Sequence, residues 1–292
     1  MQAITYALLT VIWIAGLQLV LRGAMQVWPV GLAGAYSRII SVVLLAGYLF
    51  ITGNVWRRLR PGSAWSWLLL MGAVAIGINI LWFWGQKLTT ATNAALLLRL
   101  DLLFVVLIGT ALGLERISIR GLLTIPVMLL GLVLLMEAHQ LDWSKHLAGD
   151  LMIVGAAMGL ATNAFIVRRI LQQMDESSTA FYNILISMVG FAALASYERQ
   201  AINQTSTEYT GAWLWLIAIG IIAAFATPIY YAALRRMMVW KLRAFLLLNP
   251  LIVALAEWLI WGHALNHLQW LGGGLIMIGV LLLICDEAKT SR

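Results

Sequence analysis

The sequence contains a single cysteine, Cys285, among 292 residues, so no disulfide can form within one chain. Charged residues are also scarce, at 11% of the chain, whereas hydrophobic residues make up 62% of it. No P-loop and no glycine-rich nucleotide fingerprint is present, so ATP-driven pumping has no support. The first residues, Met1–Thr5, show neither the basic region nor the cleavage site of a signal peptide. We therefore expect the chain to begin with a membrane span and to lie outside the soluble class.

Long apolar runs account for most of the chain. Backbone groups in lipid must be hydrogen-bonded within the protein, so a spanning chain forms helices or a closed barrel. The apolar runs here are about 20 residues long, the length of a membrane-spanning helix, and strand-like alternation is rare. The sequence therefore predicts an all-α membrane protein with ten transmembrane helices and no room for a soluble catalytic domain. The expected spans are approximately Ala3–Leu21, Val30–Thr52, Trp65–Gly85, Ala91–Leu112, Gly121–Met136, Gly149–Val167, Ser178–Tyr197, Trp213–Leu234, Ala244–Trp261 and Leu268–Cys285.

Basic residues are distributed unevenly between alternate loops, thirteen on one side and four on the other. By the positive-inside rule, this distribution places the N- and C-termini in the cytoplasm. The net charge of +7 is therefore interpreted as a topology signal, and no nucleic-acid partner is expected. The richer side carries Arg57, Arg58, Arg60, Arg116, Arg120, Arg168, Arg169, Arg235, Arg236, Lys241, Arg243, Lys289 and Arg292, and the poorer side carries Arg22, Lys87, Lys145 and Arg199.

The two halves of the chain resemble each other at a fixed offset. A shift of 148 residues superposes polar and glycine positions: Asp101 on Asn249, Glu115 on His263 and Gly131 on Gly279. Each half has five expected spans, so equivalent helices must run in opposite directions. We therefore predict two inverted five-helix repeats, residues 1–146 and 147–292, an architecture that recurs in secondary transporters.

Two stretches, Thr92–Met136 and Leu242–Ile284, resemble the EamA-type pattern of the drug/metabolite transporter superfamily. In that pattern a proline within a helix precedes a Gly-Glu pair and then a glycine-rich helix. Tyr36-Ser37-Arg38 and Gly149-Asp150-Leu151 also fit the starts of the two halves. The sequence departs from the pattern in each half. Leu102 stands where the second half has Pro250, and His263 stands where the first half has Glu115.

The resemblance implies a particular helix arrangement and activity. Helices one to four and six to nine would surround a central cavity, and helices five and ten would pack to one side. Members of this family carry amino acids, nucleotide sugars, sugar phosphates and other metabolites, many of them outward across the bacterial cytoplasmic (inner) membrane. An efflux transporter working by alternating access is therefore implied.

Four ionisable residues fall within expected spans, where insertion of a charge costs about 2.5–3.5 kcal/mol. Arg38 lies roughly 12 Å from the outer end of its span and shares a face with small and polar residues, which indicates a position facing protein or water. Arg99 and Asp101 lie at similar depth, about 200° apart on a continuous helix, so only one can face a given ligand. We favour Asp101 as the cavity residue and as a proton carrier for coupling, since burial favours the neutral carboxyl group. Glu257 is a second coupling candidate, although snorkelling to the membrane surface is an alternative.

Other polar and aromatic residues on inward-facing stripes complete the predicted substrate site. Small residues on these stripes also suit helix packing, and the aromatic residues also suit a lipid-facing position. Thr227-Pro228 and Asn249-Pro250 are expected to kink their helices. The further candidates are Trp13, Asn79, Trp82, Asn163, Asn183, Tyr231 and Asn249.

The sequence thus predicts a secondary transporter, not an enzyme, for a small polar, anionic or zwitterionic metabolite such as an amino acid, held by Arg38 with Asp101 nearby. A flippase of lipid-linked sugars, an intramembrane lipid-modifying enzyme and a non-transporting scaffold are the alternatives. The expected partners are the substrate, the lipid bilayer, a coupling proton or counter-substrate, and a second copy of the chain in a homodimer. No cofactor or metal is expected, because His263 and His267 have no further ligands near them.

Overall fold

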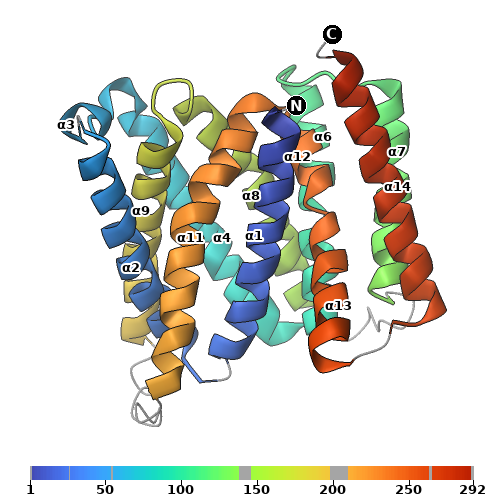
Figure 1. Cartoon of the computed structure of the whole chain (residues 1–292), viewed down its shortest axis with the longest axis horizontal. Helices are drawn as coiled ribbons and strands as arrows, with labels where there is room; N and C mark the ends of the chain where they lie inside the picture. The colour runs from blue at the N-terminus through green and yellow to red at the C-terminus, as the bar shows by residue number, and fades with distance from the viewer. Residues whose placement is uncertain are drawn as a thin grey trace. The chain divides into compact units, whose positions relative to one another are not determined.

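A computed structural model of the chain describes residues 2–25, 27–53, 55–137, 146–197, 210–262 and 265–290. Within these ranges the regular structure is entirely helical. The predicted all-α fold is therefore confirmed. Four residues named in the sequence predictions, Lys145, Arg199, His263 and Arg292, lie outside the described residues. The helices (Figure 1) are α1 (Gln2–Met25), α2 (Val30–Ile51), α3 (Val55–Arg58), the 3-10 turn η1 (Gly62–Ala64), α4 (Trp65–Leu88), α5 (Ala91–Leu98), α6 (Asp101–Ala111), α7 (Ile119–Leu135), α8 (Leu147–Ile170), α9 (Glu176–Tyr197), α11 (Thr210–Arg236), α12 (Val239–Phe245), α13 (Leu248–Trp261) and α14 (His267–Thr290).

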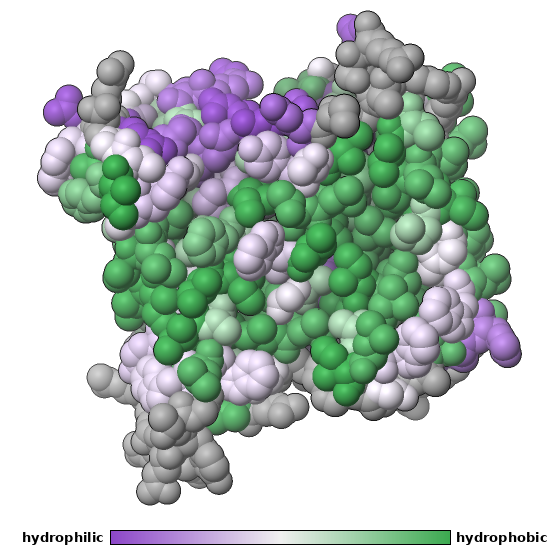
Figure 2. Space-filling model, viewed as in Figure 1, coloured by the Kyte–Doolittle hydropathy of each residue, from purple (hydrophilic) through white to green (hydrophobic). Residues whose placement is uncertain are grey.

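The helices have the length and surface of membrane spans. Among the described residues, nine helical segments are long and apolar enough to cross a membrane, and Gly121–Leu135 is a shorter apolar helix. Large hydrophobic side chains are exposed along them, for example Ile51, Leu123 and Leu259. Figure 2 shows hydrophobic residues along the middle of the visible helices, whereas hydrophilic residues gather along the upper edge, from α3 across to the upper end of α11. An apolar surface of this kind is suited to contact with lipid, whereas a protein in water would expose far less of it.

The chain forms two compact units. Unit 1 comprises Met1–Ile12, Gly77–Phe165 and Arg236–Arg292, and unit 2 comprises Trp13–Ile76 and Ile166–Arg235. Each unit therefore combines segments from both halves of the chain. The start of α1 and the end of α14 both belong to unit 1 and lie at the same end of it (Figure 1).

In unit 1, α7 and α14 pack along each other (Figure 1). These are the fifth and tenth spans, which the resemblance sets apart from the others. Glycines allow their close approach, because a Cβ added to Gly272 would lie 2.5 Å from the carbonyl oxygen of Gly131. Small residues let helix backbones meet in this way within membranes.

In unit 2, α2 packs against α9 and is also bonded to α11. The Ser41 hydroxyl donates to the carbonyl oxygen of Gly220 at 2.8 Å. A Cβ on Gly220 would meet the Ser37 carbonyl oxygen at 2.8 Å, so glycine is needed for this approach. Near the start of α2, the Trp28 indole N–H donates to the Ala212 carbonyl oxygen at 3.0 Å.

Two spans of unit 1 are broken in the middle of their sequence. The fourth span divides into α5 and α6 at residues 99–100, and the ninth divides into α12 and α13 at residues 246–247. The break in the ninth confirms the kink expected from Asn249-Pro250, since proline cannot donate to the preceding turn. The fourth breaks at the equivalent position without a proline, through hydrogen bonds from the backbone N–H groups of Arg99 and Leu100 to carbonyls three residues earlier. By contrast, α11 continues through Pro228.

The breaks differ from two expectations drawn from the sequence. The ninth span begins at Val239 rather than Ala244, so Lys241 and Arg243 lie in a buried helix and not in a loop. The angle of about 200° between Arg99 and Asp101 assumed a continuous helix and does not hold across the break.

Candidate substrate-binding site

A buried ion pair joins the two broken spans of unit 1. Arg243 Nη1 on α12 lies 2.9 Å from Asp101 Oδ2 at the start of α6. The Arg243 and Asp101 side chains are only 11% and 7% exposed, respectively. Arg243 Nη2 also donates to the carbonyl oxygen of Leu160 on α8, at 3.2 Å. Three helices thus converge on one guanidinium group.

The break in the fourth span positions the carboxylate of this pair. Asp101 is the first residue of α6, where the unpaired backbone N–H groups of a helix make its end positive. A carboxylate at that position is stabilised both by the helix end and by Arg243. Arg99, on the other side of the break, is half-buried and follows the last turn of α5.

Two asparagine side chains in unit 1 carry polar atoms without partners. Asn249 is fully buried, and neither its amide nitrogen nor its amide oxygen is hydrogen-bonded to any described residue. Asn163 Oδ1 on α8 is likewise buried and unbonded within the described part of the chain. An unsatisfied buried amide costs about 1–3 kcal/mol, and such groups are usually satisfied by water or a ligand. Asn249 and Asn163 are therefore candidates to contact a polar substrate.

The pair breaks the internal symmetry of the chain. At the offset of 148 residues, Asp101 corresponds to Asn249 and Arg243 corresponds to Ala95. The pair that the repeat relates to Asp101–Arg243 is thus Asn249 of the second half and Ala95 of the first half, neither of which carries a charge.

Unit 2 contains a separate polar set around Arg38. The Arg38 guanidinium lies over the Phe191 ring of α9, 5.7 Å from its centroid. Arg38 shares its helix face with Ser41, which contacts α11, whereas Ile39 and Val43 form the exposed face. No described carboxylate lies within ion-pair distance of Arg38. A guanidinium held in this way away from the lipid-facing side keeps its hydrogen-bond donors for another partner.

A second polar cluster of unit 2 involves Asn183 on α9. Its amide nitrogen donates to the Tyr231 hydroxyl of α11 and lies 3.9 Å from Met71 Sδ of α4. The Ser187 hydroxyl donates to Asn183 Oδ1 at 3.3 Å. Asn183 therefore links three helices, a structural role that the sequence pattern did not distinguish from ligand binding.

The remaining predicted residues divide between the units. In unit 2, Trp13 stacks on Phe225, with ring centroids 6.3 Å apart. In unit 1, Asn79 and Trp82 are half-buried on α4, and Glu257 is half-buried near the end of α13. Unit 1 thus holds Arg99, Asp101, Asn79, Trp82, Asn163, Asn249 and Glu257, and unit 2 holds Arg38, Trp13, Asn183 and Tyr231.

Glu115 holds the start of the helix that carries Arg243. Its carboxylate accepts the backbone N–H of Val239 at 2.5 Å and that of Trp240 at 3.1 Å. Residue Met238, at the cap position of α12, provides no side-chain bond. The glutamate that the family pattern places here thus positions α12, a role missed from the sequence alone.

Replacing Glu115 by alanine is expected to lower the free energy of unfolding by about 1–3 kcal/mol, because two buried N–H groups lose their acceptor. Glu115→Gln should show a smaller loss, since one amide oxygen can still accept. Thermal unfolding of the purified protein in detergent would measure both. Equal stability of Glu115→Ala and the unchanged protein would contradict the capping role.

Asp150, the second residue of the Gly149-Asp150-Leu151 motif, has a comparable structural role in unit 1. Its carboxylate accepts hydrogen bonds from the Thr89 hydroxyl and from the Asn93 amide. A Cβ on Gly149 would lie 2.8 Å from the Leu88 carbonyl oxygen. The motif therefore fastens the α4–α5 connection to the start of α8.

The sequence matches the EamA-like transporter family over residues 1–137 and again over residues 147–285. An uncharacterized transporter of Archaeoglobus fulgidus is 27% identical over 285 residues, covering 94% of each protein. A riboflavin transporter of Vibrio cholerae is 26% identical over 258 residues, covering 87% of this chain and 82% of the relative. A solved crystal structure, 18% identical, superposes with a TM-score of 0.83 over 99% of both chains and shares the fold. The chain belongs to the EamA-like transporter family and is a multi-pass membrane protein.

Proposed function

We propose that this membrane transporter moves a small polar metabolite with an anionic or zwitterionic group, such as an amino acid, by secondary active transport. The observation that carries the proposal is the Asp101–Arg243 ion pair within two broken membrane spans. A buried ion pair adds little to stability compared with well-packed apolar residues, so its presence in a span favours a functional role.

The chemistry of the pair suits a substrate that carries a carboxylate. A guanidinium binds carboxylates through two parallel hydrogen bonds, and Arg243 now divides its donors between Asp101 and Leu160. Protonation of Asp101 would weaken its hold on Arg243 and release that guanidinium for the substrate. Asp101 is therefore our candidate for proton coupling, with Glu257 as the second. A zwitterion could instead bind both members of the pair, its carboxylate on Arg243 and its ammonium on Asp101.

Alternating access would use the two inverted repeats, residues 1–146 and 147–292. The breaks of the fourth and ninth spans lie 147 residues apart, within one residue of the offset of 148, and support this repeat. Such repeats exchange conformations to open a site to either side, and broken helices are common at their binding sites. The excess of basic residues on one side favours cytoplasmic termini. The bacterial inner membrane and export are proposed from the family resemblance.

A planar aromatic substrate is the second candidate. The relative of Vibrio cholerae is named a riboflavin transporter, and unit 2 offers the stacked Trp13 and Phe225 rings. Aromatic faces of this kind can bind a heterocycle by stacking. The family and the names of its relatives favour a transporter over an enzyme.

Counterflow in proteoliposomes would test the proposal and separate the two substrate classes. Vesicles loaded with amino acids, organic anions or riboflavin would be compared with vesicles that lack the protein. Uptake of an anionic or zwitterionic solute supports the proposal, uptake of riboflavin alone favours the aromatic candidate, and flux equal to that of empty vesicles for every solute contradicts both.

Arg38→Ala is expected to weaken apparent substrate affinity about 10- to 100-fold, because one or more charge-assisted hydrogen bonds are lost. Arg116→Ala serves as the control, since Arg116 is an exposed arginine in the connection between α6 and α7. Concentration dependence of counterflow would measure both variants. Unchanged affinity of Arg38→Ala would remove Arg38 from the substrate site.

A further inference from the structure

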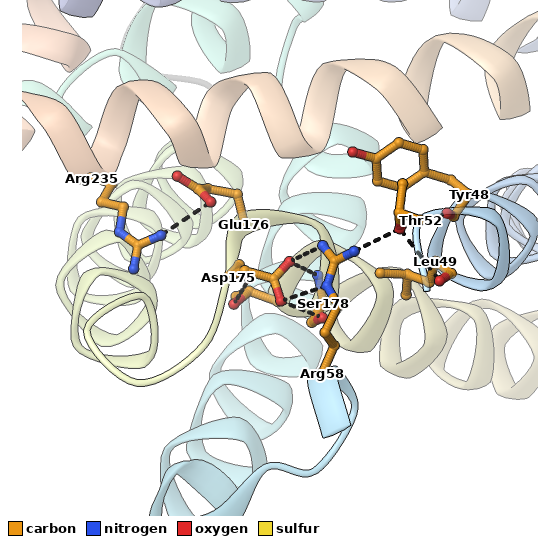
Figure 3. A network of polar contacts seen from close by, with 9 residues as sticks. Tyr48, Leu49, Thr52, Arg58, Asp175, Glu176, Ser178 and Arg235 are labelled. Atoms are coloured by element: carbon orange, nitrogen blue, oxygen red, sulfur yellow. Dashed lines mark hydrogen bonds and ion pairs between the residues drawn. The ribbon is translucent and has the colours of Figure 1, made fainter. Parts of the chain in front are cut away.

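A polar cavity of about 420 Å³ lies at one end of unit 2, apart from the Arg38 set. It is bordered by the end of α2, by the α3–α4 connection and by the turn that follows α8. Figure 3 shows the lining residue Arg58 directed toward Asp175 on one side and Thr52 on the other. Its lining residues are Thr52, Gly53, Arg58, Arg60, Gln173, Met174 and Asp175.

The acidic residue of the cavity is fully engaged. Asp175 accepts from Arg58 Nη2 at 2.7 Å and from Arg58 Nε at 3.3 Å. It also caps α9 by accepting from the Ser178 backbone N–H at 3.1 Å and from the Ser178 hydroxyl at 2.7 Å. Partial burial alone would raise the pKa of Asp175, but the bonds from Arg58 and Ser178 outweigh it and hold the pKa below its usual value. Asp175 is therefore ionised at physiological pH and its charge is balanced by Arg58, so the lining offers Arg60 no carboxylate of its own.

The basic residues of the cavity retain hydrogen-bond donors. Arg58 uses three N–H groups, two toward Asp175 and one toward the Thr52 hydroxyl at 2.7 Å, out of the five that a guanidinium carries. Arg60 is exposed and has no ion-pair or hydrogen-bond partner among the described residues. The Gln173 oxygen accepts from Ser63 at 2.7 Å, which leaves the amide N–H groups of Gln173 available. Two arginines and one aspartate give the lining a net charge of +1.

The surroundings place this cavity at the depth where spans leave the membrane. Ile51 is the last residue of α2 and is 88% exposed, and Trp56 of α3 is 77% exposed. Trp65, which begins α4, is 53% exposed. Exposed tryptophans at span ends are typical of the interfacial region, where lipid headgroups lie.

We propose that this cavity binds a phosphate group through Arg58, Arg60 and Gln173. Arginine pairs match phosphate oxygens with several charge-assisted bonds, and a side-chain amide adds a neutral donor. The phosphate comes either from the headgroup of an anionic phospholipid or from a soluble phosphate ester. A bound phosphate would join the connection after α2 to the turn before α9, which belong to different halves of the chain. The proposal does not depend on the transported substrate.

Binding to the purified full-length protein tests the proposal with three probes. Dioctanoyl phosphatidylglycerol presents the phosphate in a lipid, glycerol 3-phosphate presents it in solution, and dioctanoylglycerol presents the acyl chains alone. If phosphatidylglycerol binds and glycerol 3-phosphate does not, the cavity is a lipid headgroup site. If both bind, the cavity recognises the phosphate itself. Equal binding of dioctanoylglycerol and phosphatidylglycerol, or binding of neither phosphate, would overturn the proposal.

Two variants locate the site. Arg60→Gln is expected to weaken phosphate binding about tenfold, because it removes one charge-assisted contact without disturbing the Arg58–Asp175 pair. The control variant Arg116→Gln changes an exposed arginine of unit 1 and should bind phosphate as the unchanged protein does. Gln173→Ala should cause a smaller loss. Equal losses in Arg60→Gln and Arg116→Gln would show a general effect of surface charge and would sink the assignment.

Discussion

Replacing Arg243 by glutamine is expected to lower the free energy of unfolding by about 3–5 kcal/mol, because the Asp101 carboxylate would be left buried without its counter-charge. Asp101→Asn should cause a loss of similar size, since it leaves the guanidinium unpaired. Thermal or denaturant unfolding in detergent would measure each variant. A change below 1 kcal/mol in both variants would mean that water or lipid already solvates the pair.

An exposed ion pair in unit 2 provides the matched control. Arg235 Nη1 lies 3.1 Å from Glu176 Oε2, with side chains 42% and 20% exposed. Exposed pairs contribute about 0–1 kcal/mol, so Arg235→Gln should have little effect on stability. A comparable loss in Arg235→Gln and Arg243→Gln would contradict the argument from burial.

The double variant Asp101→Leu/Arg243→Leu separates stability from transport. Removing both charges together should restore most of the stability lost in either single variant, because apolar residues often replace a buried pair without cost. Transport in proteoliposomes should nevertheless be abolished if the pair binds substrate or carries the coupling proton. Full transport by a stable double variant would leave the pair with a purely structural role.

The helical fold could be predicted because the lipid environment imposes a simple rule on the sequence. Each span needs about 20 apolar residues; nine of the ten predicted runs correspond to described segments of spanning length, and the fifth corresponds to the shorter helix α7. Breaks within spans follow a different rule, because they depend on a few backbone hydrogen bonds. Pro250 marks one break, whereas Leu102 at the equivalent position gives no local indication of the other.

The candidate site could be predicted only in part. Asp101 and Asn249 were recognisable as polar residues in apolar runs, but Arg243 was assigned to a loop because charge near a span end usually indicates one. The internal offset could have placed Arg243 within a span. The fourth span was expected to begin at Ala91, and the residue 148 positions further on is Val239, where the ninth span begins. The capping bonds of Glu115 could not be inferred, because they join segments more than a hundred residues apart.

Gly272→Ala is expected to lower the free energy of unfolding by about 2–3 kcal/mol, because the new methyl group would meet backbone that cannot turn away. The added Cβ would lie 2.5 Å from both the Gly131 carbonyl oxygen and the Leu135 nitrogen of α7, so α7 and α14 would have to separate. This separation would disrupt the close packing that small residues allow between the two spans.

Gly274→Ala, two residues along the same helix, is the matched control. A Cβ at Gly274 meets no atom within 4 Å, and alanine has the higher helix propensity. This variant should therefore leave stability unchanged or raise it by up to about 1 kcal/mol. Opposite signs for the two alanines in detergent unfolding would show that backbone approach at Gly272, rather than the flexibility of glycine, holds α7 against α14. Equal effects would indicate that the glycines act only through the conformational freedom of the helix.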